Sequence, residues 1–217
     1  MARITTRIVL VRHGQTAWNR EVRFRGQADV PLDEAGLKQA EATGRYIASR
    51  WPVVAVYASR MSRAMRTAEA IARAHELSVR PLAGLLDINF GAWQGLTPDE
   101  VSQRYPDLFR AWIDVPHTVH FPEGEGLDIV RERGMGGLED VIARHAGQTV
   151  ALVSHTVVNR VLLCAVMGLG NERFWRLQQE TCAVNVFDAE ADPDPAGGRV
   201  FTVVQLNDTS HLQGLVP

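Results

Sequence analysis

An arginine and a histidine stand side by side near the start of the chain, directly after a run of apolar residues. The run Ile8-Val9-Leu10-Val11 is typical of a buried strand, and Arg12-His13-Gly14 follows it. Gly14 lets the backbone turn tightly, so the strand would hold both side chains rigidly at its tip. This pair could bind and attack a phosphate group. The alternative for His13 is a structural histidine that donates to a backbone carbonyl.

A second histidine has a similar setting far along the chain. The apolar run Thr149-Val150-Ala151-Leu152-Val153 predicts another buried strand, and Ser154-His155-Thr156 leads from it into a helical pattern. Peptide N–H groups at the start of such a helix bind phosphate oxygens readily, and Ser154 is suited to cap it. The sequence therefore indicates two histidines at strand-to-helix turns.

Two further arginines follow a third short strand, expected at residues 53–57. Arg60 and Arg63 are three residues apart in the segment Ser59 to Glu69, which we expect to begin a helix. Side chains with this spacing can face the same side of a helix. Arg60 is left open between a ligand-binding group and a solvated surface charge.

These segments, taken in order, resemble the histidine phosphatase superfamily, the phosphoglycerate mutase-like proteins. The resemblance spans residues 7 to about 165 and rests on six stretches, which are Arg12-His13-Gly14, Arg23 to Asp29 with Pro31-Leu32, Ser59 to Ala68, Asp87 to Gly95, Pro122 to Glu125, and Ser154-His155. Within the superfamily, residues 112–119, 153–160 and 206–212 resemble the metal-independent phosphoserine phosphatases. Phe90 and Gly126 depart from that pattern, where a His and a Ser are usual, and this favours a less discriminating pocket.

The resemblance implies a phosphomonoesterase that works through a phosphohistidine. Neutral His13 would be the nucleophile, while Arg12, Arg63 and a protonated His155 neutralise the phosphoryl oxygens. Asp87 stands where the family usually carries Glu and would protonate the leaving group, which requires a raised pKa. The alternative for Asp87 is a cap of the following turn.

Further side chains are expected to contact the substrate. Asn19 and Gln27 receive this role from the resemblance, because their amide groups suit phosphate oxygens or a bridging water. The remaining candidates for substrate binding are Thr16, Gly26, Arg60, Thr156, Phe90 and His211. No cofactor is implied. A zinc site at His117 and His120 is disfavoured, because they lie in a proline-rich segment without a cysteine.

The substrate is expected to be a small phosphorylated metabolite, with phosphoserine as the first candidate. Alternatives within enzymes are an α-ribazole phosphate or sugar phosphate phosphatase and a phosphoglycerate mutase. A different class is a non-catalytic module that binds a phosphorylated ligand. All four of Arg12, His13, Arg63 and His155 are present, whereas such modules normally lack one of them.

Composition limits the partners and the location. The 217 residues are 46% hydrophobic and 22% charged, and 23 basic against 25 acidic residues give a net charge of −2. This charge argues against nucleic acid as a partner.

The most apolar stretch, residues 149–169, contains Ser154, His155, Asn159 and Arg160, which excludes a membrane span there. We expect a cytoplasmic protein without a signal peptide, with Cys164 and Cys182 buried and reduced. The oligomeric state is left open between a monomer and a homodimer.

Strand and helix patterns alternate along the chain, which predicts an α/β fold. The expected architecture is a three-layer α/β/α arrangement with a mainly parallel central sheet, phosphoglycerate mutase-like, in one domain over residues 1–217. Residues 84–125 would form a roof insertion over the carboxyl ends of the strands. Expected strands are 7–12, 53–57, 79–82, 149–153, 183–188 and 199–206, and expected helices are 33–50, 61–75, two within 97–114, 126–145 and 155–167. Residues 189–198 would form a solvated hairpin loop, and Gly134, Gly136 and Gly137 predict a kink or close packing in the helix 126–145.

Overall fold

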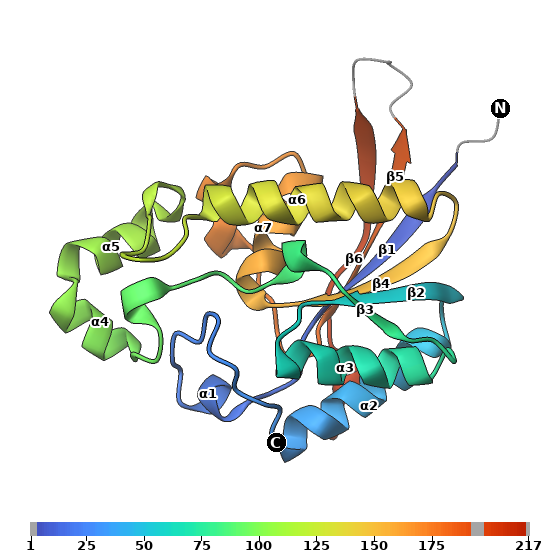
Figure 1. The fold of residues 1–217 in the computed structure, drawn as a ribbon, viewed down its shortest axis with the longest axis horizontal. Coiled ribbons are helices and arrows are strands. Elements are labelled where there is room, and N and C mark those ends of the chain that lie inside the picture. Colours follow the sequence, from blue (N-terminus) through green and yellow to red (C-terminus); the bar gives the residue numbers. More distant parts are fainter. Residues whose placement is uncertain (1–3, 192–197, 216–217) are drawn as a thin grey trace.

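A six-stranded sheet forms the centre of the computed structural model, which describes residues 4–191 and 198–215 (Figure 1). The strands lie in the order β3-β2-β4-β1-β5-β6. The first four in this order are mutually parallel, whereas β5 is antiparallel to β1 and β6 is antiparallel to β5. Their bounds are β1 Thr6–Arg12, β2 Val53–Ala58, β3 Val79–Pro81, β4 Thr149–Ser154, β5 Val184–Ala191 and β6 Arg199–Asp208. The predicted mainly parallel sheet is confirmed.

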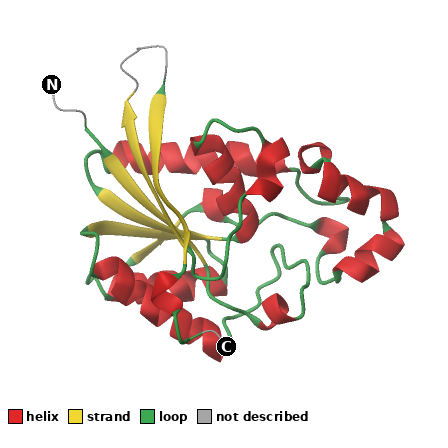
Figure 2. Ribbon diagram, turned by 180° about the vertical axis from the view of Figure 1, so that it is seen from behind, coloured by secondary structure: helices red, strands yellow, loops and turns green. Residues whose placement is uncertain are grey.

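Helices cover both faces of this sheet (Figure 2). Side chains alternate across a strand, so Ile8 and Leu10 of β1 pack on one face while Val9 and Val11 pack on the other. The first face meets α6 (Leu127–Arg144) and α7 (Thr156–Val166), and the second meets α2 (Glu34–Ala48) and α3 (Ser62–Arg73). The three-layer α/β/α prediction is confirmed, and every predicted strand and helix is found with its ends displaced by no more than three residues.

The segment between β3 and α6 lies beyond the carboxyl ends of the parallel strands (Figure 1). It contains α4 (Pro98–Arg104), α5 (Pro106–Asp114) and the short 3₁₀ helices η1 (Ala83–Leu85), η2 (Gly91–Trp93) and η3 (Pro116–Thr118). Its aromatic side chains pack edge to face, with ring centroids 4.9 Å apart for both Trp93–Phe121 and Phe90–Phe121. The chain is completed by α1 (Ala17–Arg20), η4 (Asn171–Arg176) and η5 (Ser210–Leu212).

Two local expectations need correction. Ser154 does not cap α7, because it is the last residue of β4 and its Oγ donates to the Leu85 carbonyl at 2.7 Å, which leaves His155 as the N-cap. Residues 189–191 continue β5 instead of starting a loop, and residues 192–197 lie outside the described residues.

The glycines of α6 are explained in part by close packing. A Cβ at Gly134 would lie 3.2 Å from Leu162 Cδ2, and one at Gly137 would lie 3.5 Å from the Gly84 Cα. Gly136 faces open space, and nothing in the structure explains it.

Cys164 and Cys182 are both buried and unbridged, as expected. Among the described residues, no helix is long and apolar enough to cross a membrane.

Candidate active site

The two histidines lie side by side because their strands are neighbours. Arg12 of β1 pairs with Ser154 of β4, so the residue after each strand end leaves the sheet at the same level. The His13 backbone N–H donates to the Ser154 carbonyl at 3.0 Å. The ring centroids of His13 and His155 are 5.1 Å apart, and both side chains are completely buried. The sheet therefore brings together two groups that are 142 positions apart in the sequence.

His13 has one ring nitrogen engaged and the other free. Its Nδ1 lies 2.7 Å from the Gly14 carbonyl oxygen, and a carbonyl can only accept, so Nδ1 carries the proton. Nε2 then presents its lone pair and has no hydrogen-bond partner in the described part of the chain. Burial, His155 and Arg63 hold the pKa of His13 well below its usual value. A neutral imidazole with a fixed tautomer can act as a nucleophile.

The turn after His13 depends on the absence of a side chain at Gly14. A Cβ at this position would lie 2.6 Å from the Gly36 carbonyl oxygen, at the start of α2. The Gly14 N–H donates to Thr67 Oγ1 of α3 at 3.1 Å. The turn is therefore packed between two helices.

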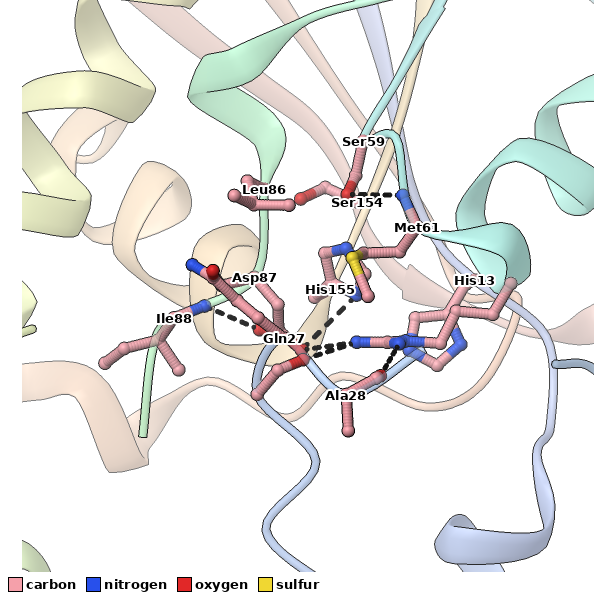
Figure 3. Close-up of polar contacts among 12 residues, drawn as sticks. His13, Gln27, Ala28, Ser59, Met61, Leu86, Asp87, Ile88, Ser154 and His155 are labelled. Atoms are coloured by element: carbon pink, nitrogen blue, oxygen red, sulfur yellow. Dashed lines mark hydrogen bonds and ion pairs between the residues drawn. The ribbon is translucent and has the colours of Figure 1, made fainter. Parts of the chain in front are cut away.

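His155 is less constrained than His13. Its Nδ1 lies 3.4 Å from Asp87 Oδ2, but neither ring nitrogen makes a hydrogen bond to any described residue (Figure 3). Burial, Arg63 and Arg25 hold the pKa of His155 well below its usual value. A protonated His155 was expected with a phosphoryl group bound, and this stays a prediction; in the ligand-free site the lowered pKa favours the neutral ring.

Arg63 and Asp87 form a buried ion pair beside the two histidines. Arg63 Nη2 lies 3.0 Å from Asp87 Oδ2, and the guanidinium also donates to the carbonyls of Gly26 and Ala28, each at 2.8 Å. Burial raises the pKa of Asp87, although Arg63 and Arg25 oppose this. The pKa of Asp87 is thus raised, as proton donation requires. Burial is the cause, and it outweighs the two nearby arginines.

Arg133 of α6 holds the segment that carries Asp87. Its guanidinium donates to the carbonyls of Gly84 at 3.0 Å, Leu86 at 2.6 Å and Asp87 at 3.1 Å. The same guanidinium makes two contacts with the Glu125 carboxylate, at 3.0 and 3.1 Å. Both carboxylate oxygens of Glu125 therefore accept hydrogen bonds from Arg133. No sequence motif places Arg133 near Asp87, so this role could not be predicted from the sequence.

Guanidinium N–H groups without a hydrogen-bond partner gather around the histidines. Within the described residues, the buried Nε atoms of Arg12, Arg25 and Arg63 have no hydrogen-bond partner. Burial, followed by Arg25, lowers the pKa of Arg12 to about 9, and burial lowers that of Arg25 to about 10. Cations that weaken one another in this way would be stabilised by an anion placed among them. Arg25 lies in a loop, and only its place in the stretch Arg23 to Asp29 could have suggested it.

A pocket of about 650 Å³ opens above this cluster. Of the predicted site residues, it is lined by Arg12, Asn19, Gly26, Asp87, Phe90 and Thr156. His13, Arg63 and His155 are buried and are not among the residues that line it. The pocket is also lined by residues that the sequence analysis did not assign to it, among them Arg25, Arg160, Trp175 and Glu180.

Two predicted binding residues support the site without lining the pocket. Thr16 is buried and caps α1, where its Oγ1 donates to Asn19 Oδ1 at 2.9 Å. Gln27 Nε2 donates to the Asp87 carbonyl at 3.1 Å (Figure 3). Thr16 and Gln27 therefore hold two residues that do line the pocket, Asn19 and Asp87.

Two other candidate binding residues lie away from this pocket, and the exposed position of Arg60 agrees with the solvated surface charge that was its alternative. Arg60 precedes α3 and is exposed, in a separate hollow with Leu82 and Leu86. It therefore does not share a helix face with Arg63. His211 stacks on Tyr46 with ring centroids 4.6 Å apart, and its Nε2 is 2.9 Å from Thr43 Oγ1. It packs against α2, away from the pocket.

Comparison with known proteins agrees with this geometry. The profile of the histidine phosphatase superfamily (branch 1) matches residues 8–200. The chain is 36% identical over 206 residues to phosphoserine phosphatase 1 of Hydrogenobacter thermophilus, covering 95% of this chain and 94% of that protein. It is 31% identical over 212 residues to a metal-independent phosphoserine phosphatase of Arabidopsis thaliana, covering 97% and 84%. The structure of Bacillus stearothermophilus YhfR matches with a TM-score of 0.86 at 31% identity, covering 95% of this chain and 99% of that one. The chain belongs to the histidine phosphatase superfamily.

Proposed function

We propose that this protein is a phosphomonoesterase that hydrolyses a small phosphorylated metabolite through a phosphohistidine on His13. The observation that carries this proposal is the buried, unpartnered Nε2 of a neutral His13, with its tautomer fixed by the Gly14 carbonyl. Nε2 attacks phosphorus while the bond from phosphorus to the leaving oxygen breaks. Water then attacks the phosphohistidine, the P–N bond breaks, and inorganic phosphate leaves.

The arginines and His155 bind the phosphoryl oxygens in this mechanism. A phosphomonoester dianion repels nucleophiles, so its charge must be neutralised before Nε2 can approach. Arg12, Arg25 and Arg63 each have a buried N–H without a partner in the described residues. A dianion among them would also favour the charged form of His155, which is neutral in the ligand-free site. His155 then donates a charge-assisted hydrogen bond.

Asp87 serves as the general acid. Its raised pKa keeps a proton available for the leaving oxygen, and the resulting carboxylate can accept a proton from the attacking water in the second step. The carboxylate that forms is stabilised by Arg63 at 3.0 Å. Asp87 also lines the pocket, so it can reach the leaving group.

Phosphoserine is the first substrate to test, because two relatives bear the name phosphoserine phosphatase. A panel of phosphomonoesters ranked by kcat/KM, with phosphoserine, sugar phosphates and phosphoglycerates, identifies the preferred class. The proposed reaction needs no cofactor. Cytoplasmic location and the choice between monomer and homodimer stay predictions.

Hydrolysis of p-nitrophenyl phosphate in excess chelator tests the proposed function. We expect release of nitrophenol that chelator does not reduce, with inhibition by vanadate, which resembles the phosphorane-like transition state. A module that only binds phosphorylated ligands would release no nitrophenol. Activity that disappears with chelator and returns with a divalent metal would contradict the metal-independent mechanism.

A further inference from the structure

Arg160 stands in the pocket wall, and no carboxylate of the described residues forms an ion pair with it. It lies on α7 one turn after Thr156, and both residues line the pocket, as the spacing of four predicts. The buried Nε has no hydrogen-bond partner, and its guanidinium forms no ion pair within the described residues. Burial lowers the pKa of Arg160 more than Glu180 raises it. An arginine in this state is stabilised by any anion that enters the pocket.

Two aromatic rings hold this guanidinium in place. Its central carbon lies 5.2 Å from the ring centroid of Phe174 and 5.0 Å from that of Trp175. Trp175 is itself fixed, because its Nε1 donates to the Trp112 carbonyl at 2.7 Å. Stacking on aromatic faces stabilises the cation but uses none of its in-plane N–H donors. The wall therefore positions Arg160 and leaves its fork of donors free.

Arginines outnumber carboxylates in the pocket. Five arginines and two carboxylates line it, and among the described residues only Arg23 of the five forms ion pairs, with Glu21 and Glu100, whereas the whole chain has a net charge of −2. Arg12 and Arg25 belong to the phosphoryl end, next to Asp87. Arg160 belongs to the outer end, where Trp175 is 41% exposed. The pocket thus has a second positive centre, near enough to Arg12 to lower its pKa.

We propose that Arg160 binds a carboxylate that the substrate carries in addition to its phosphoryl group. The substrate class is then phosphorylated carboxylic acids, such as O-phosphoserine or phosphoglycerates, and not phosphorylated alcohols or amines. This inference rests on the proposed function. A guanidinium and a carboxylate pair through two parallel hydrogen bonds, so Arg160 would fix the orientation of the substrate as well as its affinity.

A matched pair of substrates tests the subsite. O-phosphoserine and O-phosphoethanolamine differ only in the carboxylate, so the ratio of their kcat/KM values measures its recognition. We expect the wild type to prefer phosphoserine by about 10- to 100-fold, the range for one charge-assisted interaction. Arg160→Met, which keeps an apolar stem against the rings, should lower kcat/KM for phosphoserine by a similar factor and that for phosphoethanolamine far less. Arg160→Lys should recover part of the preference, because it keeps the charge but loses the fork.

Arg173 provides the matched control. It is an exposed arginine on η4, next to the aromatic wall, and it does not line the pocket. Arg173→Met removes the same charge and should keep the wild-type ratio. The pair 3-phosphoglycerate and glycerol 3-phosphate repeats the comparison without an amino group. The proposal predicts a preference in both pairs. Equal kcat/KM values for 3-phosphoglycerate and glycerol 3-phosphate would overturn a subsite that recognises the carboxylate itself.

Binding to the His13→Ala variant separates this inference from the proposed function. Calorimetry should show tighter binding of phosphoserine than of phosphoethanolamine, and adding Arg160→Met should remove the difference. Equal affinities, or a difference that survives Arg160→Met and Arg160→Lys, would overturn the subsite even if p-nitrophenyl phosphate is hydrolysed. A difference that depends on Arg160, in a wild type that hydrolyses no phosphomonoester, would support the subsite and contradict the phosphatase.

Discussion

Strands β1 and β4 are neighbours, and each ends in a buried histidine, but the two histidines are held differently. His13 is followed by a tight turn at Gly14, whose carbonyl folds back to accept from Nδ1 at 2.7 Å. His155 is the N-cap of α7, so the chain enters a helix at once and no carbonyl returns to its ring. Its nearest polar contact is Asp87 Oδ2, at 3.4 Å. The difference arises because β1 leads into a tight turn whereas β4 leads into a helix.

This contrast suits the two histidines to different roles, His13 as a nucleophile and His155 as a group that binds the phosphoryl oxygens. An anchored ring has one tautomer and one lone pair at a fixed position, which suits a nucleophile. A ring without an anchor can protonate and donate when an anion arrives, which suits a group that binds phosphoryl oxygens. Both histidines are buried and both have lowered pKa values, so burial alone does not distinguish them.

The largest expected effect comes from replacing the two histidines one at a time. His13→Ala should abolish turnover and also abolish acid-labile, base-stable labelling by a radioactive phosphoryl donor. His155→Ala should lower kcat by about 10²- to 10³-fold, as for the loss of one oxyanion donor, but the label should still form. Quantitative labelling of both variants at equal protein concentration checks this. A label that persists in His13→Ala and is absent in His155→Ala would reverse the assignment.

The second effect concerns Asp87, whose Oδ2 lies 3.4 Å from Nδ1 of His155, the histidine without a fixed tautomer. Asp87→Asn should lower kcat on alkyl phosphates by roughly two to four orders of magnitude, because their alkoxide leaving groups need a proton. Activity on p-nitrophenyl phosphate should fall far less, since nitrophenolate leaves without one. In the wild type, burial raises the pKa of Asp87, so activity on alkyl phosphates should decline as the pH rises through that pKa.

Glu123→Gln is the control for Asp87→Asn. Glu123 is exposed in the same region and does not line the pocket, so its variant should behave as the wild type on both substrates. Equal losses of Asp87→Asn on both substrate types would show that Asp87 only positions the segment. Glu125 is then an unsuitable replacement acid, because Arg133 holds its carboxylate at 3.0 and 3.1 Å.

The sheet and the two histidines could be predicted because their signals are local. An apolar run gives a strand, and a parallel neighbour gives a shared edge, so His13 and His155 meet as expected. The expected helix 33–50 is found as α2, whose N-cap Asp33 accepts from the Gly36 N–H at 2.8 Å.

Tertiary contacts account for what the sequence did not reveal. Arg25, Arg133 and Arg160 reach the site from a loop and from two different helices, and no spacing links them to His13. His211 was assigned to the substrate from a resembling stretch, but the 3₁₀ helix η5 turns it against Tyr46. The charge of His155 depends on how many cations surround it, which only the folded arrangement fixes.

A smaller effect is expected from Arg133, which touches the site only through the backbone of Asp87. Arg133→Met should lower kcat on alkyl phosphates by about 10- to 100-fold, the scale of a small displacement of a reacting group. The loss on p-nitrophenyl phosphate should be smaller, and the basic limb of the pH profile should move, because the environment of Asp87 changes. Arg133→Lys should recover part of the activity. Arg144→Met, an exposed change on the same helix, is the control. Equal losses on both substrates without a shift of the pH profile would indicate a structural role alone.

The smallest effect is the pH dependence of stability, and it tests whether the two histidines are equally neutral. The unfolded chain binds a proton on each histidine below about pH 6.5, whereas burial prevents this in the folded state. The free energy of unfolding should therefore fall as the pH decreases from 6.5, by at most about 1.4 kcal/mol per pH unit for each histidine. Asp87 contributes with the opposite sign, since its raised pKa retains a proton that the unfolded chain releases above about pH 3.8.

Urea unfolding between pH 5 and 7 in the Asp87→Asn background, without phosphate in the buffer, removes the opposing contribution of Asp87. Burial also lowers the pKa values of His75 and His211, so each site histidine is measured as the difference between its variant and this background. His13→Asn and His155→Asn should each flatten the pH dependence, and by similar amounts, whereas His117→Asn should not, because His117 is exposed. If only His13→Asn flattens it, His155 already carries its proton in the folded ligand-free protein. The unanchored ring would then be a permanent cation and not a group that becomes charged when the phosphoryl dianion binds.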